Sequence, residues 1–145
     1  MLTTNQKGVV AETAIVHQAV RHGIGVWLPV SSHERYDLIF DADGKLSRVQ
    51  CKTAVRVGDV LVVRLYSTRR CATGLLKRAY SADEIDAFAA FSPDTGKCYH
   101  LEMSQFAGHT EVSLRLHRTK NNQAQGVRWA RDYEFGATLG ALQGP

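Results

Sequence analysis

Two short stretches decide the fold of this chain: Tyr-Asp-Leu-Ile-Phe at residues 36–40 and Val-Gln-Cys-Lys-Thr at residues 49–53. Both are rich in β-branched, aromatic and aliphatic residues, and the Asp-Ala-Asp-Gly segment that follows the first is typical of a turn. The sequence therefore predicts a β-hairpin. Because strand side chains alternate between two faces, Gln50 and Lys52 project to the same side, next to Asp37 on the neighbouring strand.

These side chains suit the hydrolysis of a phosphodiester. That reaction needs an activated water molecule, neutralised charge on the attacked phosphate and a stabilised leaving oxygen. The Asp37 carboxylate, the Gln50 side chain and the Cys51 backbone carbonyl offer oxygen ligands of the kind that Mg²⁺ prefers. Lys52 can orient or deprotonate the attacking water, or stabilise negative charge as it develops. An ammonium beside carboxylates stays charged unless desolvation dominates, which favours the charge-stabilising role.

A helix is predicted upstream, from about Asn5 to His22. Apolar residues recur there at steps of three and four, and Gly23 follows as a stop signal. Glu12 falls within this apolar stripe, where an unpaired carboxylate is costly. It is either a carboxylate that favours the helix dipole, or a metal ligand that joins Asp37. The predicted stripe consists of Val9, Ile15, Val16, Ala19 and Val20.

The remainder of the chain is predicted to form strands and basic loops. Asp59–Tyr66 contains a nearly continuous apolar run, as in a strand covered on both faces. Ser67–Tyr80 carries basic residues around Gly74 with few core anchors, and we interpret it as a basic, mobile loop. A second basic, polar loop is predicted at residues 117–122. The predicted strands are Gly25–Val30, Tyr36–Phe40, Leu46–Thr53, Asp59–Tyr66, Ile85–Phe91, Lys97–Met103 and Glu111–His117.

The composition is that of a globular protein. The 145 residues, 44% hydrophobic and 22% charged, fit one domain with its own core. The formal net charge of +4 and the pI of about 9.1 suit a polyanionic partner without requiring one. No apolar run approaches the roughly 18 residues of a membrane span, and the N-terminus lacks the layout of a secretory signal. We therefore expect no membrane association and a cytoplasmic location.

The motifs occur in one consistent order: Lys7-Gly8-x-x-x-Glu12, Gly23 before Val26–Pro29, Tyr36-Asp37-Leu38, Val49–Thr53, Ile85–Phe88, and Ser92-Pro93 to Tyr99. Together they resemble the PD-(D/E)XK nuclease superfamily, and more narrowly its small homing endonucleases encoded in group I introns. The resemblance covers roughly residues 5–105 and leaves residues 106–145 as a C-terminal extension for DNA contact or oligomerisation. It implies an α/β (α+β mixed) fold in a single domain, residues 1–145. The core would be restriction-endonuclease-like, a central mixed β-sheet flanked by helices.

The resemblance also implies a role for each site residue. Asp37 would be the central metal ligand, Lys52 the catalytic lysine, and Glu12 the helix carboxylate that completes or supports the metal site. Gln50 stands where most of the superfamily has Asp or Glu, but members of the narrower group carry Gln there, so an active enzyme is expected. The predicted catalytic set is Glu12, Asp37, Gln50 and Lys52; the predicted ligands of Mg²⁺, or of Mn²⁺ in its place, are Asp37, Glu12 and the backbone carbonyl of Cys51.

The expected function is that of a metal-dependent DNA endonuclease, homing- or restriction-like, acting on double-stranded DNA. A chain with one site cuts one strand, so a double-strand break needs at least two copies, and the resemblance implies a homodimer or homotetramer. The alternatives are a Holliday-junction resolvase with the same core, and a catalytically inactive DNA-binding module with a nuclease fold. The candidate DNA contacts are Arg56, Arg64, Arg69, Arg70, Lys77 and Arg78 in a first cluster, and Arg115, His117, Arg118 and Lys120 in a second.

Overall fold

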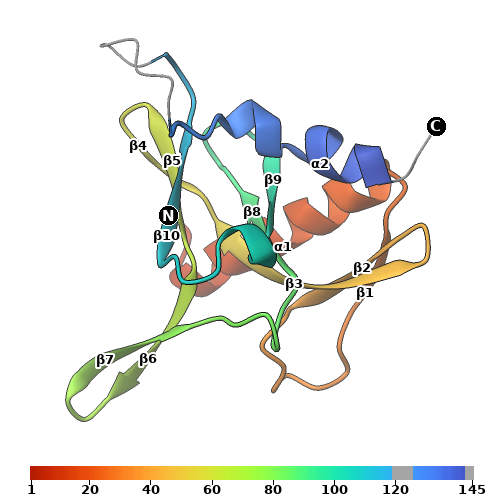
Figure 1. The fold of residues 1–145 in the computed structure, drawn as a ribbon. Helices are drawn as coiled ribbons and strands as arrows, with labels where there is room; N and C mark the ends of the chain where they lie inside the picture. Colours follow the sequence, from red (N-terminus) through yellow and green to blue (C-terminus); the bar gives the residue numbers. More distant parts are fainter. Residues whose placement is uncertain (119–125, 143–145) are drawn as a thin grey trace.

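The computed structural model describes residues 1–118 and 126–142 (Figure 1). Its centre is a five-stranded sheet in the order β1-β2-β3-β8-β9. Strands β2 and β3 form an antiparallel hairpin, β3 runs parallel to β8, and β9 returns antiparallel to β8. Helices α1 and α2 pack on the same face of this sheet. The fold is therefore the mixed α/β fold that the sequence predicts, with a central mixed sheet and flanking helices.

The elements have the following bounds. In chain order they are α1 (Thr4–Arg21), β1 (Gly25–Trp27), β2 (Leu38–Ala42), β3 (Lys45–Thr53), β4 (Val55–Val57), β5 (Val60–Arg64), β6 (Tyr66–Cys71), β7 (Gly74–Ala79), β8 (Ala87–Phe91), β9 (Cys98–Glu102), β10 (Glu111–Arg115) and α2 (Phe135–Leu142). Short 3₁₀ turns cover Met103–Gln105 and Ala130–Tyr133. In the described part of the chain, none of the helices has the length and apolar character that crossing a membrane requires.

A second, three-stranded sheet in the order β10-β5-β4 packs on the other face of the central sheet. Its inner side chains include Leu61 and Val63 from β5 and Leu114 from β10, all fully buried. Val60 and Val62, in contrast, lie on the outer face and are only half-buried. The prediction that the Asp59–Tyr66 run is covered on both faces is therefore wrong, because among the described residues no further layer covers the outer face of this small sheet.

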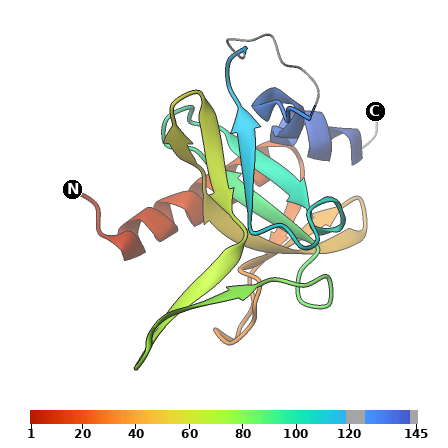
Figure 2. The same ribbon diagram turned by 60° about the vertical axis from the view of Figure 1, so that its left-hand side comes forward.

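The segment predicted as a basic, mobile loop, Ser67–Tyr80, is a hairpin. Strands β6 and β7 pair antiparallel from Tyr66 opposite Ala79 to Cys71 opposite Gly74. The hairpin projects from the body of the molecule (Figure 2), and every residue of β7 is exposed. With no buried face, the sequence shows no alternation of apolar and polar residues, which is why the strands could not be recognised from the pattern.

The apolar stripe of α1 also differs from the prediction. Val9 and Val20 are each 60% exposed. Glu12 follows the first residue of the buried line and is half-buried at the edge of the packed face, rather than in its middle. The carboxylate can therefore reach the margin of the central sheet. The buried line of the helix consists of Ala11, Ile15 and Ala19, at steps of four residues.

Candidate active site

The β2–β3 hairpin brings Asp37 next to Cys51. The backbone N–H of Asp37 donates to the Val49 carbonyl at 2.9 Å, and the Cys51 N–H donates to Oδ2 of Asp37 at 3.0 Å. The N–H and C=O of one strand residue point to the same side of the strand, so the Cys51 carbonyl also faces the side of Asp37. One oxygen of the Asp37 carboxylate is held by the backbone, and the other is left to bind a ligand.

The turn at the far end of the hairpin fixes this register. Asp43 and Gly44 both have positive φ, 56° and 86°, and link Ala42 to the opposite Lys45. Two consecutive positive φ values are characteristic of the type I′ turn, whose twist matches that of the strands it joins. A slip by one residue would move Lys52 to the opposite face of the sheet, so the turn determines which side chains meet Asp37.

Glu12 adds a second carboxylate, from α1. Partial burial raises the pKa of Glu12, and the negative charge of Asp37 raises it further. Burial also raises the pKa of Asp37, against the opposing effects of the Cys51 hydrogen bond and the charge of Lys52. No described basic side chain forms an ion pair with either carboxylate. The two acids therefore form a partly desolvated, negatively charged pair that a bound cation would stabilise.

Lys52 reaches the site from the opposite strand of the hairpin. Its Nζ donates a hydrogen bond to the Tyr66 carbonyl at 2.8 Å and lies 5.1 Å from the centre of the Tyr80 ring. Burial lowers the pKa of Lys52 to about 8, which the charge of Asp37 opposes and that of Arg35 reinforces. The ammonium is still mostly protonated at neutral pH, and it is poorly hydrated, so it interacts strongly with any nearby anion.

Gln50 and Cys51 are the remaining β3 residues at the candidate site. The Gln50 Nε2 atom lies 3.5 Å from the Cys51 carbonyl oxygen, which is long for a hydrogen bond. A flip of the amide would exchange its nitrogen and oxygen with little change in shape, and would present an oxygen to the same place. The Cys51 side chain packs against the core under α1, and burial raises the pKa of its thiol. The thiol therefore faces the helix side of the central sheet.

This donor set fits a hard divalent cation. In residues 1–118 and 126–142, no three His, Cys, Asp or Glu side chains gather as metal ligands. A cation here would rely on the Glu12 and Asp37 carboxylates together with neutral oxygens such as the Cys51 carbonyl. Oxygen donors of mixed charge, completed by water molecules, are what Mg²⁺ commonly uses in proteins.

Arg35 is a neighbour of the site that the sequence did not indicate. Its guanidinium lies 3.9 Å from the centre of the Tyr80 ring. It donates to Ser67 Oγ at 3.2 Å and to the Ala79 carbonyl at 3.1 Å, and its Nε lies 3.4 Å from Glu84 Oε2. A single arginine in a loop carries no recognisable sequence signal, so only the three-dimensional structure could reveal it.

The candidate DNA contacts lie on several elements. The first cluster divides between the three-stranded sheet, which carries Arg56 and Arg64, and the β6–β7 hairpin, which carries the other four. In the second cluster, Arg115 ends β10, where its side chain donates to the His117 carbonyl at 2.9 Å. Arg118 is exposed, and Lys120 lies outside the described residues. The residues on the hairpin are Arg69, Arg70, Lys77 and Arg78.

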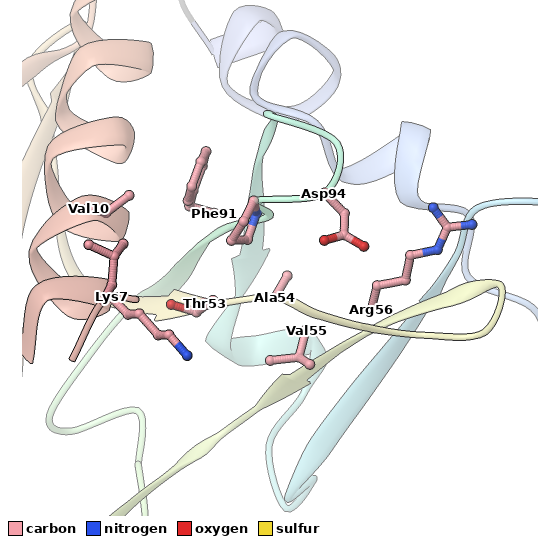
Figure 3. Close-up of a pocket in the computed structure, with 10 residues that line it drawn as sticks. Lys7, Val10, Thr53, Ala54, Val55, Arg56, Phe91 and Asp94 are labelled. Atoms are coloured by element: carbon pink, nitrogen blue, oxygen red, sulfur yellow. The ribbon is translucent and has the colours of Figure 1, made fainter. Parts of the chain in front are cut away.

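A cavity of about 400 Å³ lies next to this region but is separate from it (Figure 3). It opens between the first turns of α1 and the chain from Thr53 to Arg56, with Lys7 on one side and Asp94 on the other. Most of its lining is apolar, and none of the four candidate catalytic residues contributes to it. The carboxylate pair and the cavity are therefore different features of the surface.

Comparisons with known proteins agree with this fold. A search of solved structures finds that the chain is similar to a bacterial homing endonuclease, I-Ssp6803I, with a TM-score of 0.77 and 23% identity over 99% of each chain. A search of curated proteins gave no match. The model of the PD-(D/E)XK endonuclease family matches residues 2–136, which is nearly the whole sequence. This chain therefore belongs to the PD-(D/E)XK endonuclease family.

Proposed function

We propose that this protein is a Mg²⁺-dependent endonuclease that hydrolyses phosphodiester bonds in double-stranded DNA, in the manner of a homing or restriction enzyme. The observation that carries the proposal is the position of Glu12, Asp37 and Lys52. They come from α1, from the residue that precedes β2 and from β3, and they meet at the open end of one hairpin. Two carboxylates with no ion-pair partner among the described residues lie there beside a poorly hydrated ammonium. Charged side chains that serve only solubility remain hydrated, whereas these three are partly desolvated, as is common at functional sites.

Glu12, Asp37 and the Cys51 carbonyl would hold the cation. When bound, a divalent ion of this kind supplies charge neutralisation at the attacked phosphate and lowers the pKa of a nearby water molecule. The role of the chain is to keep these oxygens in place. Asp37 is fixed through its bond from the Cys51 N–H, and Glu12 through the packing of α1 on the central sheet.

Lys52 would stabilise the charge that develops on the phosphate. An ammonium has three N–H donors, and Tyr66 uses one of them, so two remain for phosphate oxygens or for the attacking water. Removal of its hydration increases the energy of that interaction. The same desolvation brings its pKa to about 8, so a role as general base gains importance as the pH rises above neutrality.

The β6–β7 hairpin is the element we assign to the DNA groove. The major groove of B-DNA admits a two-stranded β-ribbon. Arg70 and Lys77 lie on one face of this ribbon, and Arg69 and Arg78 lie on the other. Cations on both faces suit a ribbon inserted between two phosphate backbones better than one that lies flat on a single backbone.

Cleavage of supercoiled plasmid in the presence of Mg²⁺ or Mn²⁺ tests the proposal. Wild type should nick the plasmid, and Lys52→Ala and Asp37→Ala should each reduce the rate by about a hundredfold or more. Lys97→Ala is the matched control, since Lys97 pairs with Glu134 outside the site and its loss should leave the rate unchanged. Equal rates for wild type and Lys52→Ala would refute the proposal.

The same protein preparations separate the alternatives. A preference for four-way junctions over linear duplex would identify a resolvase. Tight DNA binding without any metal-dependent cleavage would identify a binding module with an inactive nuclease fold.

A further inference from the structure

We propose that Arg35 is a positioning residue that connects the β6–β7 hairpin to Lys52, so that DNA held by the hairpin sets the place of the catalytic ammonium. This inference rests on the proposed function, because it assumes that the hairpin holds DNA and that Lys52 acts on it. It assigns to Arg35 a role that no sequence motif indicates.

The first observation is at the base of the hairpin, where Tyr66 is paired with Ala79. The backbone carbonyls of these two residues each accept a hydrogen bond from a cationic side chain. Lys52 Nζ donates to the Tyr66 carbonyl at 2.8 Å, and Arg35 Nη2 donates to the Ala79 carbonyl at 3.1 Å. Arg35 Nη1 also donates to Ser67 Oγ, one residue further along β6. A displacement of the hairpin base would therefore move the acceptor of the Lys52 ammonium.

The second observation is the ring of Tyr80, which directly follows β7. The Arg35 guanidinium lies 3.9 Å from its centre and Lys52 Nζ lies 5.1 Å from it. The ring is buried, and it packs edge-on against Phe88 of the central sheet with 5.4 Å between the ring centres. Tyr80 is thus fixed to the core, and both cations lie against the same fixed aromatic ring.

The third observation is a carboxylate shared between Arg35 and the hairpin. Glu84 Oε2 lies 3.4 Å from Arg35 Nε and accepts a hydrogen bond from Arg78 Nη2 at 2.8 Å. Arg78 is exposed on β7, where we expect a DNA phosphate to bind. A phosphate at Arg78 would compete with Glu84 for its guanidinium, and Glu84 would then pair with Arg35 alone. DNA binding and the environment of Lys52 are thereby linked through named contacts.

Arg48 provides the matched comparison for a merely structural arginine. It also forms an ion pair and donates to carbonyls: it contacts Asp86 at 3.1 Å and bonds to the carbonyls of Asp83 and Ala82. It lies on β3, four residues before Lys52, and its side chain binds the segment from Ala82 to Asp86 rather than the base of the β6–β7 hairpin. Loss of either arginine should lower the thermal midpoint, whereas only loss of Arg35 should alter Lys52.

Single-turnover cleavage tests the coupling. Arg35→Ala should lower the cleavage rate at saturating DNA by about tenfold to a hundredfold, because a misplaced catalytic group reduces the rate by that much. The DNA concentration at half-saturation should change by less than about threefold. Arg48→Ala should retain the wild-type rate at a temperature below its midpoint. Glu84→Gln, which keeps the shape of the side chain, should shift the rate in the same direction as Arg35→Ala by a smaller factor. Equal losses of rate in Arg35→Ala and Arg48→Ala would overturn the inference.

A second measurement does not depend on cleavage. Acetic anhydride labelling followed by mass spectrometry reports how accessible each lysine Nζ is, provided that it is done at a pH of about 10.5 or above, where the change in charge at position 35 has little effect on the nucleophilic fraction of Lys52. Lys52 should react several-fold faster in Arg35→Ala than in wild type relative to Lys97 in the same sample, and at the wild-type ratio in Arg48→Ala. An unchanged ratio in a folded Arg35→Ala protein would refute the positioning role. Failure of the wild type to cut DNA, with the labelling result as expected, would instead refute the proposed function.

Discussion

Among single residues, Gln50 is the one whose substitution we expect to strengthen metal binding. It is neutral, and its amide lies 3.5 Å from the Cys51 carbonyl, a predicted ligand. A glutamate there would add a negative charge next to Glu12 and Asp37. We predict that Gln50→Glu increases Mn²⁺ affinity by about tenfold or more, because a close charge pair near a protein surface is worth several kcal/mol before desolvation.

Isothermal titration calorimetry with Mn²⁺ measures this change. Gln105→Glu is the control: it alters the net charge equally at an exposed position in the Met103–Gln105 turn. An affinity that rises equally in both variants would mean that net charge alone is responsible, and would argue against a metal site at Gln50.

His100 is a residue whose burial gives stability a pH dependence. It is 2% exposed on β9, and burial lowers its pKa to about 4 from 6.5. Between these pH values the unfolded chain binds a proton at His100 that the folded chain does not. The free energy of unfolding therefore decreases as the pH falls from 6.5 to 4, and above pH 6.5 this group gives it no pH dependence. The contribution is at most about 1.4 kcal/mol per pH unit.

Urea unfolding at several pH values checks this prediction. His100→Leu should show a shallower decrease than wild type in that window, while His17→Leu, at an exposed position of α1, should follow the wild type. Parallel curves for wild type and His100→Leu would contradict the assignment.

The sequence indicated the candidate site residues on and next to the β2–β3 hairpin, but it did not indicate Arg35, which lies in a loop. Alternation along the strand placed Gln50 and Lys52 on one side, and the turn residues placed Asp37 beside them, because both rules follow from local backbone geometry. Arg35 contacts Ser67, Ala79 and Glu84, which lie 32 to 49 residues away along the chain. No local rule could bring these partners together.

At the level of elements, the β2–β3 turn can be tested through its glycine. Gly44 has a φ of 86°, and a Cβ there would meet nothing within 4 Å, so only the backbone conformation opposes a side chain. Gly44→Ala should therefore lower the free energy of unfolding by about 1 kcal/mol. Gly8, in α1 and equally open, has no such constraint, and Gly8→Ala should raise it by about 0.5–1 kcal/mol. Chemical denaturation measures the free energy of unfolding of both variants. If both substitutions changed it in the same direction, the turn assignment would be contradicted.

The β6–β7 hairpin predicts a salt-dependent DNA affinity. Each cation that neutralises a phosphate contributes nearly one unit to the slope of log affinity against log salt. Arg70→Ala and Lys77→Ala should each weaken binding to any duplex and reduce that slope by about one. Fluorescence anisotropy over a range of salt concentrations measures this, with Lys97→Ala as the unaffected control. A slope that does not change in the hairpin variants would place the DNA elsewhere.

Elements with a buried face were predictable and those without one were not. Apolar residues recur with a clear period in the predicted helix, Asn5–His22, and in the predicted hairpin strands, Tyr36–Phe40 and Leu46–Thr53. The structure has these segments as α1, β2 and β3. The β6–β7 hairpin is held by backbone hydrogen bonds and by contacts at its base, so its sequence is mostly polar and basic, and its two leucines, Leu75 and Leu76, are exposed. Polar composition alone predicts a loop, and here that prediction is wrong.

At the level of the whole molecule, the outer face of the β10-β5-β4 sheet is the surface we expect to contact a second copy. Val55 and Val57 are 56% and 59% exposed, and they lie opposite the half-buried Val62 and Val60. Contiguous apolar surface of this kind is unusual on a monomer. Val55 also lines the cavity beside α1, where Lys7, Arg56 and Asp94 supply both signs of charge, which suits a surface that pairs with itself.

The double variant Val55→Lys and Val57→Lys should therefore shift the protein towards monomer in sedimentation velocity. Leu46→Lys changes an equally exposed apolar residue on the other sheet and should leave the assembly unchanged. A wild-type protein that is monomeric with DNA bound, or a double variant that assembles as the wild type does, would contradict the proposed interface.

We propose that Glu12 and Asp37 hold the metal ion that cleavage uses. Anomalous diffraction from a crystal grown with Mn²⁺ tests it most directly, because the signal locates the ion irrespective of activity. We predict a peak within coordination distance of the Asp37 carboxylate, the Glu12 carboxylate and the Cys51 carbonyl, and no peak there in Asp37→Ala. A Mn²⁺ peak bound elsewhere, with none beside Asp37, would contradict the account.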